Sequence, residues 1–169
     1  MARHFNITGE LTQELLAAGS NTNVSSISLT NVNFGGSTLV DIYIEKQLTG
    51  KFYLLKKVEL PVGVTLFHDI KGFNNKAGGF GLYIKLTKSD VFTLTGTIDP
   101  AASATVPGVN TLFLTEVVIG DEIIVSAETR TVSAIASNTS LTVSAATTNT
   151  ANDTTPDCSP KSRIDVILS

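Results

Sequence analysis

The residues of this chain that could do catalytic chemistry are few and widely spaced. His68 and Asp69 are the one adjacent pair of histidine and carboxylate. Neighbours on a strand point to opposite faces, so these two side chains cannot act together on one substrate atom. The single cysteine, Cys158, lies between two prolines with no histidine close in sequence, and a cysteine nucleophile needs an activating base. The sequence therefore predicts no catalytic residue and a protein that is not an enzyme.

Metal and cofactor sites have as little support as catalytic ones. Two histidines and one cysteine, widely spaced, lack the spacing of a zinc site. The acids at 121–122 and at 153 and 157 do not follow the calcium-loop pattern, and we expect them on a solvated face. The glycines at 35–36 and 78–81 do not open a helix with a lysine–serine pair, so they predict turns with positive φ. We expect no metal and no cofactor.

Composition limits the class of protein. The chain is 42% hydrophobic and 16% charged, which is enough apolar material for a packed core. A net charge of −3 is too small to indicate a nucleic-acid partner. No apolar run approaches the ~18 residues of a membrane helix, and the first residues lack the apolar run of a signal peptide. These features predict a protein made and kept in a cytoplasm, without a membrane or nucleic-acid partner.

A small basic cluster is the one surface feature that the sequence offers. Lys51, Lys56 and Lys57 lie close to the aromatic residues Phe52 and Tyr53. The cluster could be a nucleic-acid surface, a contact to an acidic partner subunit, or a solvated patch. The second and third interpretations are favoured, and these five residues are the expected assembly contacts.

Strand patterns dominate the chain. Alternating apolar and polar residues at 40–45, 64–70 and 80–86 have the period of half-buried strands, and 26–32 and 52–60 indicate further strands. Glycine, proline and asparagine separate these runs at short intervals. Residues 11–18, which end at a glycine, are the one helix candidate of this half, although a strand fits them nearly as well. The expected fold is all-β, a small antiparallel β-sandwich of jelly-roll-like type.

The chain is expected to contain an inserted module. Residues 164–168 form an apolar strand pattern after a Lys-Ser-Arg sequence, and a similar Lys-Ser pair follows the pattern at 80–86. We therefore predict that 164–168 joins the same sheet system as 80–88, and that the intervening residues are inserted into a hairpin loop. The predicted boundaries are a sandwich of 1–90 plus 161–169, an inserted β module of 91–146, and a linker of 147–160.

The module has its own expected elements and charge. Short strands are predicted at 92–96, 121–125, 129–136 and 140–143, and a single helical turn at 112–116. Residues 91–160 hold seven acids and one base, Arg130, for a net charge of −6, whereas the rest of the chain carries +3. Arg130 is expected to pair with one of these acids.

Two parts of the sequence resemble phage proteins. The ordered residues of 110–116, 119–125, 129–132 and 135–143, with Gly120-Asp121, Arg130 and the run Thr139-Ser140-Leu141-Thr142-Val143, resemble a small β-barrel module that recurs in virion proteins of phage tails, fibres and head accessories. Residues 25–31, 40–44, 52–56 and 60–66 resemble small virion β-sandwiches of marine and cyanobacterial phages. Neither resemblance brings catalytic residues.

The resemblance implies a virion structural protein, assembled in a host bacterial cytoplasm. The expected function is that of a capsid decoration (cement) protein or a head–tail accessory component. Its expected partners are other virion proteins, such as the major capsid or tail and neck proteins, and further copies of itself, as a trimer by analogy. The alternative is a tail-fibre or baseplate module that binds a surface glycan, although sugar platforms use exposed Trp and Tyr and this chain has no Trp and three Tyr. We expect the basic sandwich to hold the particle and the acidic module to project.

Overall fold

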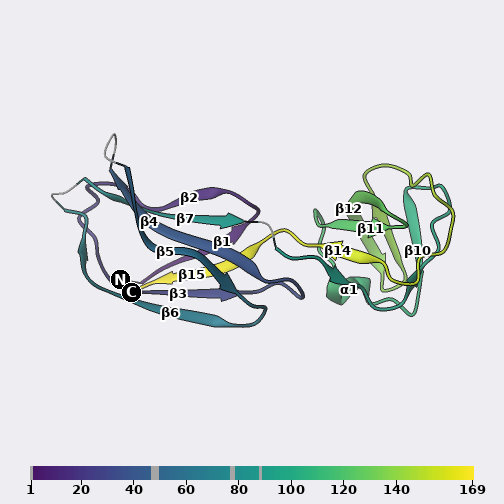
Figure 1. Ribbon diagram of the computed structural model, residues 1–169, viewed down its shortest axis with the longest axis horizontal. Coiled ribbons are helices and arrows are strands. Elements are labelled where there is room, and N and C mark those ends of the chain that lie inside the picture. Colours follow the sequence, from purple (N-terminus) through teal and green to yellow (C-terminus); the bar gives the residue numbers. More distant parts are fainter. Residues whose placement is uncertain (1, 47–49, 77–78, 88) are drawn as a thin grey trace. The chain divides into compact units, whose positions relative to one another are not determined.

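The computed structural model describes residues 2–46, 50–76, 79–87 and 89–169, with the side chain of Lys71 left aside. The chain divides into two compact units (Figure 1). Unit 1 comprises Met1–Asn33, Ser37–Lys88 and Ser162–Ser169, and unit 2 comprises Phe34–Gly36 and Ser89–Lys161. Among the described residues, no helix is long and apolar enough to cross a membrane. The short segment Phe34–Gly36 belongs to unit 2 although the residues on both sides of it belong to unit 1.

Unit 1 consists of two four-stranded antiparallel sheets. Sheet A has the order β1-β15-β3-β6 and sheet B the order β2-β7-β4-β5. The strands are β1 (Arg3–Thr8), β2 (Thr12–Leu16), β3 (Asn23–Asn31), β4 (Thr38–Lys46), β5 (Gly50–Leu60), β6 (Thr65–Asn74), β7 (Gly81–Thr87) and β15 (Arg163–Leu168). Figure 1 shows the two sheets of unit 1 as two layers. The all-β sandwich expected from the sequence is confirmed.

The chain path of unit 1 is that of a jelly roll. Of the seven connections between its eight strands, β4 to β5 alone stays within one sheet, and each of the others passes between sheet A and sheet B. The last strand, β15, is added between β1 and β3 and hydrogen-bonds to both. The two sheets keep four edge strands, β1 and β6 in sheet A and β2 and β5 in sheet B. The expected jelly-roll-like topology is therefore present.

The core of unit 1 lies between the two sheets. Alternate residues of every strand point inward, which is the period-two pattern seen in the sequence. Sixteen apolar side chains are buried there, among them Ile27 and Leu29 of sheet A and Ile42, Leu82 and Ile84 of sheet B. Residues 11–18, the helix candidate, form strand β2 instead, because Leu15 and Leu16 reach this core only if the segment pairs with β7.

The last strand returns to unit 1, as predicted, but one expectation about the insertion needs correction. Strand β15 lies in unit 1, but it pairs with β1 and β3 in sheet A, whereas β7 lies in sheet B. Unit 2 is therefore inserted into a connection between sheets and not into a hairpin loop. The repeated Lys-Ser pair does not encode which strands the last strand pairs with, and β15 lies between β1 and β3. Lys88 itself lies outside the described residues.

Unit 2 is built on a seven-stranded antiparallel sheet in the order β8-β14-β11-β12-β13-β10-β9. Its elements are β8 (Phe92–Thr93), β9 (Thr97–Ile98), β10 (Thr105–Val109), α1 (Phe113–Glu116), β11 (Glu122–Val125), β12 (Glu128–Ser137), β13 (Ser140–Val143) and β14 (Asp157–Ser159). The helical turn expected at 112–116 and the strand at 140–143 are confirmed. The sheet is not closed into a barrel, so the expected β-barrel is corrected to an open sheet.

The segment 147–160, expected as a linker, belongs to unit 2. Strand β14 pairs with β11 on one side and β8 on the other, and Cys158 is fully buried in the core of this unit. The segment is poor in large apolar residues, which suggested a linker. Backbone hydrogen bonds and the one buried thiol nevertheless hold this segment in place. Strands β8 and β11 provide the hydrogen-bond donors and acceptors on both sides of β14.

Candidate functional site

The outer face of sheet B carries a row of tyrosines. Three registers place Glu14 of β2 opposite Tyr83 of β7, Tyr83 opposite Tyr43 of β4, and Tyr43 opposite Tyr53 of β5. The row therefore crosses all four strands and contains all three tyrosines of the chain. Residues directly opposite one another on antiparallel strands contact through their side chains. We call Glu14, Tyr83, Tyr43, Tyr53 and the adjoining Lys51 and Lys56 the tyrosine face.

The tyrosine rings are packed against one another. The centroids of Tyr43 and Tyr83 lie 5.5 Å apart with an interplanar angle of 15°, and those of Tyr43 and Tyr53 lie 5.6 Å apart at 53°. These separations are within the range of favourable aromatic pairs. Tyr43, at the centre, is only 1% exposed, whereas Tyr53 at the β5 edge is 42% exposed. The face is thus a preformed aromatic surface held on rigid strands.

Two lysines cover the β5 end of the row. The ammonium of Lys51 lies 4.6 Å from the centroid of the Tyr43 ring, and that of Lys56 lies 4.8 Å from the centroid of Tyr53. Cations placed over an aromatic face are attracted by its quadrupole. A hydrogen bond with Tyr43 raises the pKa of Lys51, so this lysine stays charged at neutral pH. The β5 end of the face therefore carries two ammonium groups, and the Glu45 residue of β4 lies opposite Lys51 in the register.

The β2 end of the row is anionic. The Tyr83 hydroxyl donates a hydrogen bond of 2.9 Å to the Glu14 carboxylate. This hydrogen bond, with a smaller contribution from burial, raises the pKa of Tyr83, so its phenol stays protonated. Glu14 is itself exposed. The tyrosine face consequently has a carboxylate at one end and two ammonium groups at the other.

Local backbone features make room for the row. A Cβ on Gly81 would lie 2.8 Å from the ring of Tyr83, so the absence of a side chain there lets the ring lie flat along β7. On β5, the backbone N–H of Lys57 donates to the Asp41 carboxylate at 2.6 Å, and Lys57 has a positive φ of 50°. The pairing of β4 with β5 shifts register beside this position. The resulting bulge brings Lys56 onto the same face as Tyr53.

The five residues expected as assembly contacts are only partly together. Lys51, Tyr53 and Lys56 lie on the tyrosine face. Phe52 pairs with Ile44, and the side chain of Ile44 packs against the core. The centroid of the Phe52 ring lies 5.9 Å from that of the Phe80 ring. Lys57 lies in the bulge, where its backbone N–H donates to the Asp41 carboxylate. Alternation along a strand separates Phe52 from its neighbours, because successive side chains point to opposite faces.

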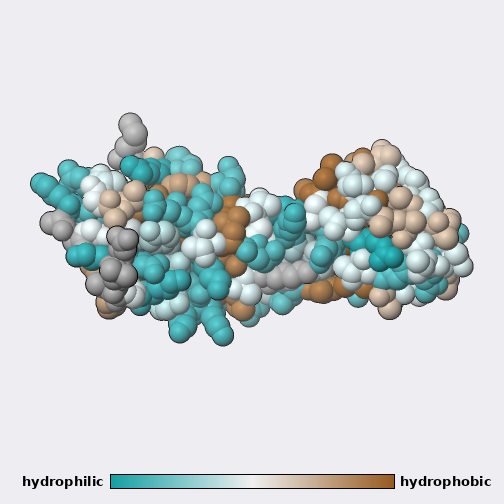
Figure 2. All heavy atoms as spheres, turned by 90° about the horizontal axis from the view of Figure 1, so that it is seen from above, coloured by the Kyte–Doolittle hydropathy of each residue, from teal (hydrophilic) through white to brown (hydrophobic). Residues whose placement is uncertain are grey.

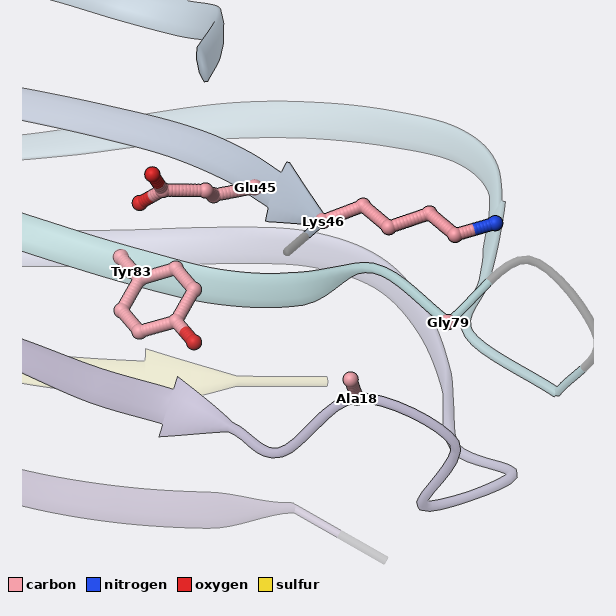
Figure 3. A pocket seen from close by; sticks show the side chains of 5 residues that line it. All are labelled: Ala18, Glu45, Lys46, Gly79 and Tyr83. Carbon is pink, nitrogen blue, oxygen red and sulfur yellow. The ribbon is translucent and has the colours of Figure 1, made fainter. Parts of the chain in front are cut away.

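A shallow pocket of about 530 Å³ adjoins the tyrosine face. It is lined by Ala18, Glu45, Lys46, Gly79 and Tyr83. Figure 3 shows the Glu45 carboxylate and the Lys46 ammonium pointing in opposite directions along β4. Catalysis needs groups that converge on one reacting atom. The carboxylate and the ammonium group beside this pocket point away from each other and do not converge on one point.

The residues considered for chemistry do not converge either. Within the described ranges, no three His, Cys, Asp or Glu side chains gather in a way that could hold a metal ion. His68 of β6 is half-buried and its neighbour Asp69 is exposed, as expected for opposite faces of one strand. Cys158 is buried in unit 2. Gly36 and Gly79 have positive φ, as expected for turns, whereas Gly81 is a strand residue and Gly78 lies outside the described residues.

The acids of unit 2 have structural partners. Glu116 accepts from the backbone N–H of Thr95, and Asp121 accepts from those of Val118 and Lys161. The carboxylates of Glu128 and Asp153 bind backbone N–H groups in the same way. Asp121 is only 1% exposed, so the expectation that it lies on a solvated face is wrong. The negative charge of this unit serves in large part to bind its own loops.

Arg130 pairs with Glu128, as expected from its being the one base among seven acids. Its guanidinium also donates to the Ala146 carbonyl at 3.2 Å. The same Glu128 carboxylate accepts hydrogen bonds from Thr148 and Asn149, and these bonds lower its pKa to about 2. Glu128 therefore joins strand β12 to the loop that precedes β14.

Unit 2 also exposes aliphatic side chains around α1. The most exposed of them are Leu114 and Ile119, each 61% accessible, and hydrophobic surface is visible on this unit in Figure 2. Further exposed members are Val109, Leu112 and Val118. Scattered exposed apolar residues are common on protein surfaces, and these side chains point to no particular ligand.

Sequence reasoning did not identify Glu14, Tyr43 and Tyr83 as site residues. Tyr43 and Tyr83 occupy the outward positions of the alternating patterns at 40–45 and 80–86, which was the available signal. The alternation shows which face a tyrosine occupies on its own strand. It does not show that β7 lies beside β4, which is the fact that brings the rings together.

Comparisons of this chain with protein-family models, with curated proteins and with solved structures find no match.

Proposed function

We propose that this chain is a non-enzymatic structural component of a phage particle, a capsid decoration or head–tail accessory protein that acts by binding other proteins. The observation that carries the proposal is the tyrosine face. Tyrosine on a rigid surface is one of the residue types that dominate the energetics of protein–protein interfaces, and the two lysines beside it add charge that can orient a partner. The rings are fixed by their neighbours before binding, so little conformational entropy is lost when a partner docks.

Two further features support an assembly role. Jelly rolls are a frequent architecture of viral coat proteins, although the fold alone does not determine function. Within the described residues, no group of three His, Cys, Asp or Glu side chains could hold a metal ion. The glycan-binding alternative has less support, because a sugar platform needs open ring faces. Tyr43 is 1% exposed, and Lys56 lies over the ring of Tyr53.

The test is incorporation into particles. A tagged copy of the chain, supplied in infected cells, is expected to co-purify with intact particles and to be detected there by mass spectrometry. The variant Tyr53→Ala with Lys56→Glu should reduce incorporation by about 30-fold, the effect of losing ~2 kcal/mol at an interface hot spot. The matched control is Phe67→Ala on the outer face of sheet A, where Phe67 is 66% exposed, and it should leave incorporation unchanged.

Two results would contradict the proposal. The chain could be absent from purified particles, or the Tyr53 and Lys56 variant could be incorporated as well as the unchanged chain. Glycan-array binding that is lost in the same variant, together with absence from particles, would favour the host-recognition alternative.

A further inference from the structure

The tyrosine face has opposite charges at its two ends. At the β2 edge the exposed carboxylate of Glu14 accepts from Tyr83, and at the β5 edge the ammonium groups of Lys51 and Lys56 lie over Tyr43 and Tyr53. Between these ends the row consists of aromatic rings, and the same face also carries Asp41 and Glu45 of β4 and Lys85 of β7, with Asp41 opposite Lys85 in the register. A row with a carboxylate at one end, ammonium groups at the other and aromatic rings between them is complementary to its own copy turned by 180°.

We infer that the tyrosine face binds a second copy of this chain, face to face, about a two-fold axis parallel to the strands of sheet B. This inference rests on the proposed function, because it names the partner of the same face. Such an axis places β2 of one copy over β5 of the other. Glu14 then meets Lys51 and Lys56 of the second copy twice in each dimer, as an isologous interface requires.

Other arrangements lack this complementarity. A two-fold axis perpendicular to the strands places β2 over β2, so that Glu14 meets Glu14 and the lysines meet lysines. Like charges brought together at an interface oppose association. A three-fold arrangement uses two different surfaces of each copy and would not place the tyrosine face against itself. The charge pattern therefore selects the two-fold axis parallel to the strands.

The size of the face sets the expected strength of the dimer. Four strands spaced about 4.8 Å apart, over roughly seven residues, present about 400–500 Å² of plane per copy. Stable interfaces bury about 800 Å² per partner, so the dimer is expected to be reversible, with a dissociation constant in the micromolar range. Oligomeric state should therefore be measured from about 1 to 200 μM.

The experiment uses charge reversal and rescue in the full chain. In sedimentation velocity, the unchanged chain should show a concentration-dependent monomer–dimer equilibrium. Glu14→Lys alone, and Lys51→Glu with Lys56→Glu, should each raise the dissociation constant by at least ~30-fold through like-charge contacts. An equimolar mixture of the two variants should form a mixed dimer again, because both of its charged contacts then join opposite charges. Circular dichroism of each variant checks that it is folded.

Several outcomes would overturn the inference. These are a monomer across the whole concentration range, a trimer, a dimer that the reversals leave unchanged, or a mixture of the variants that does not associate. The proposed function is tested separately by incorporation into particles. A chain that is monomeric in solution but enters particles through Tyr53 would refute the dimer and retain the assembly role.

Discussion

In unit 1, sixteen apolar side chains of the described residues are buried between two sheets, whereas unit 2 buries eleven and has a single open sheet over its core. Unit 2 compensates with polar contacts from side chain to backbone. Four of its carboxylates, those of Glu116, Asp121, Glu128 and Asp153, accept hydrogen bonds from backbone N–H groups of its loops.

Both units consist mainly of strands, but different interactions stabilise them. Two sheets facing each other bury one side of every strand, and burial of apolar area is then the main stabilising term. A short-stranded open sheet has more loop per strand, and its loop N–H groups need acceptors. Charged acceptors make the stronger hydrogen bonds, which accounts for much of the acidic character of unit 2.

The largest expected effect comes from the core of unit 2. Phe113 is completely buried, so Phe113→Ala should destabilise unit 2 by about 3–5 kcal/mol. If the units are stabilised separately, calorimetry should show one transition shifted and the other unchanged. Leu114→Ala, one residue further on and 61% exposed, is the control and should change stability by less than about 0.5 kcal/mol. A single transition that shifts as a whole would contradict separate stabilisation.

Gly36 lies in the connection from β3 to β4 of unit 1 but belongs to unit 2, so a substitution there tests which unit it stabilises. Its φ is 79°, and a Cβ there would lie 2.2 Å from the Asp90 carbonyl oxygen. Gly36→Ala should therefore cost about 2 kcal/mol or more, chiefly in the transition of unit 2. Gly19→Ala in unit 1 has a similar φ of 74° but no atom within 4 Å, and should cost only about 1 kcal/mol. Equal costs would show that the close approach to Asp90 is not maintained.

The contacts of Glu128 predict a pH dependence of the stability of unit 2. Hydrogen bonds from Thr148 and Asn149 lower the pKa of Glu128 from 4.5 to about 2. A lowered folded-state pKa contributes stability that is present above pH ~4.5 and is lost as the pH falls through about 2. Glu128→Gln should reduce this dependence between pH 4.5 and 2 and lower stability at neutral pH, as measured by urea unfolding. Asp99→Asn, an exposed acid of the same unit, is the control; a pH profile that Glu128→Gln leaves unaltered would contradict the assignment.

The smallest effect is expected at the turn between β11 and β12. Ala127 has a φ of 66°, a left-handed conformation that costs a residue with a Cβ about 1–2 kcal/mol. Ala127→Gly should therefore stabilise unit 2 by about 0.5–1 kcal/mol after the entropic cost of glycine. Ala134→Gly, within β12, should destabilise by a similar amount. Thermal unfolding of the two variants gives opposite shifts in Tm if this is correct, and shifts of the same sign if it is not.

The sequence by itself determined most strands of the sandwich, those at 26–32, 40–45, 52–60, 64–70, 80–86 and 164–168, and the faces of their alternating residues. Alternation at 40–45 and 80–86 places Ile42 and Ile84 inward and Tyr43 and Tyr83 outward, and the structure keeps this division. The period of two is a local property of an extended backbone, so a few residues suffice to show it. The return of the last strand to the first unit was predicted from its apolar strand pattern together with the repeated Lys-Ser pair, and Ser162–Ser169 does belong to unit 1.

Only the tertiary structure decided which strands are neighbours. The tyrosine face exists because β7 pairs with β4 and β2, and β15 enters sheet A and not sheet B. Long-range pairing with β11 also makes part of the expected linker a strand, β14. The fold of unit 2 brings its acids to loop backbone N–H groups, from which they accept hydrogen bonds. Pairing depends on contacts between residues up to 165 positions apart, as Arg3 with Leu168, and no local pattern encodes such a partner.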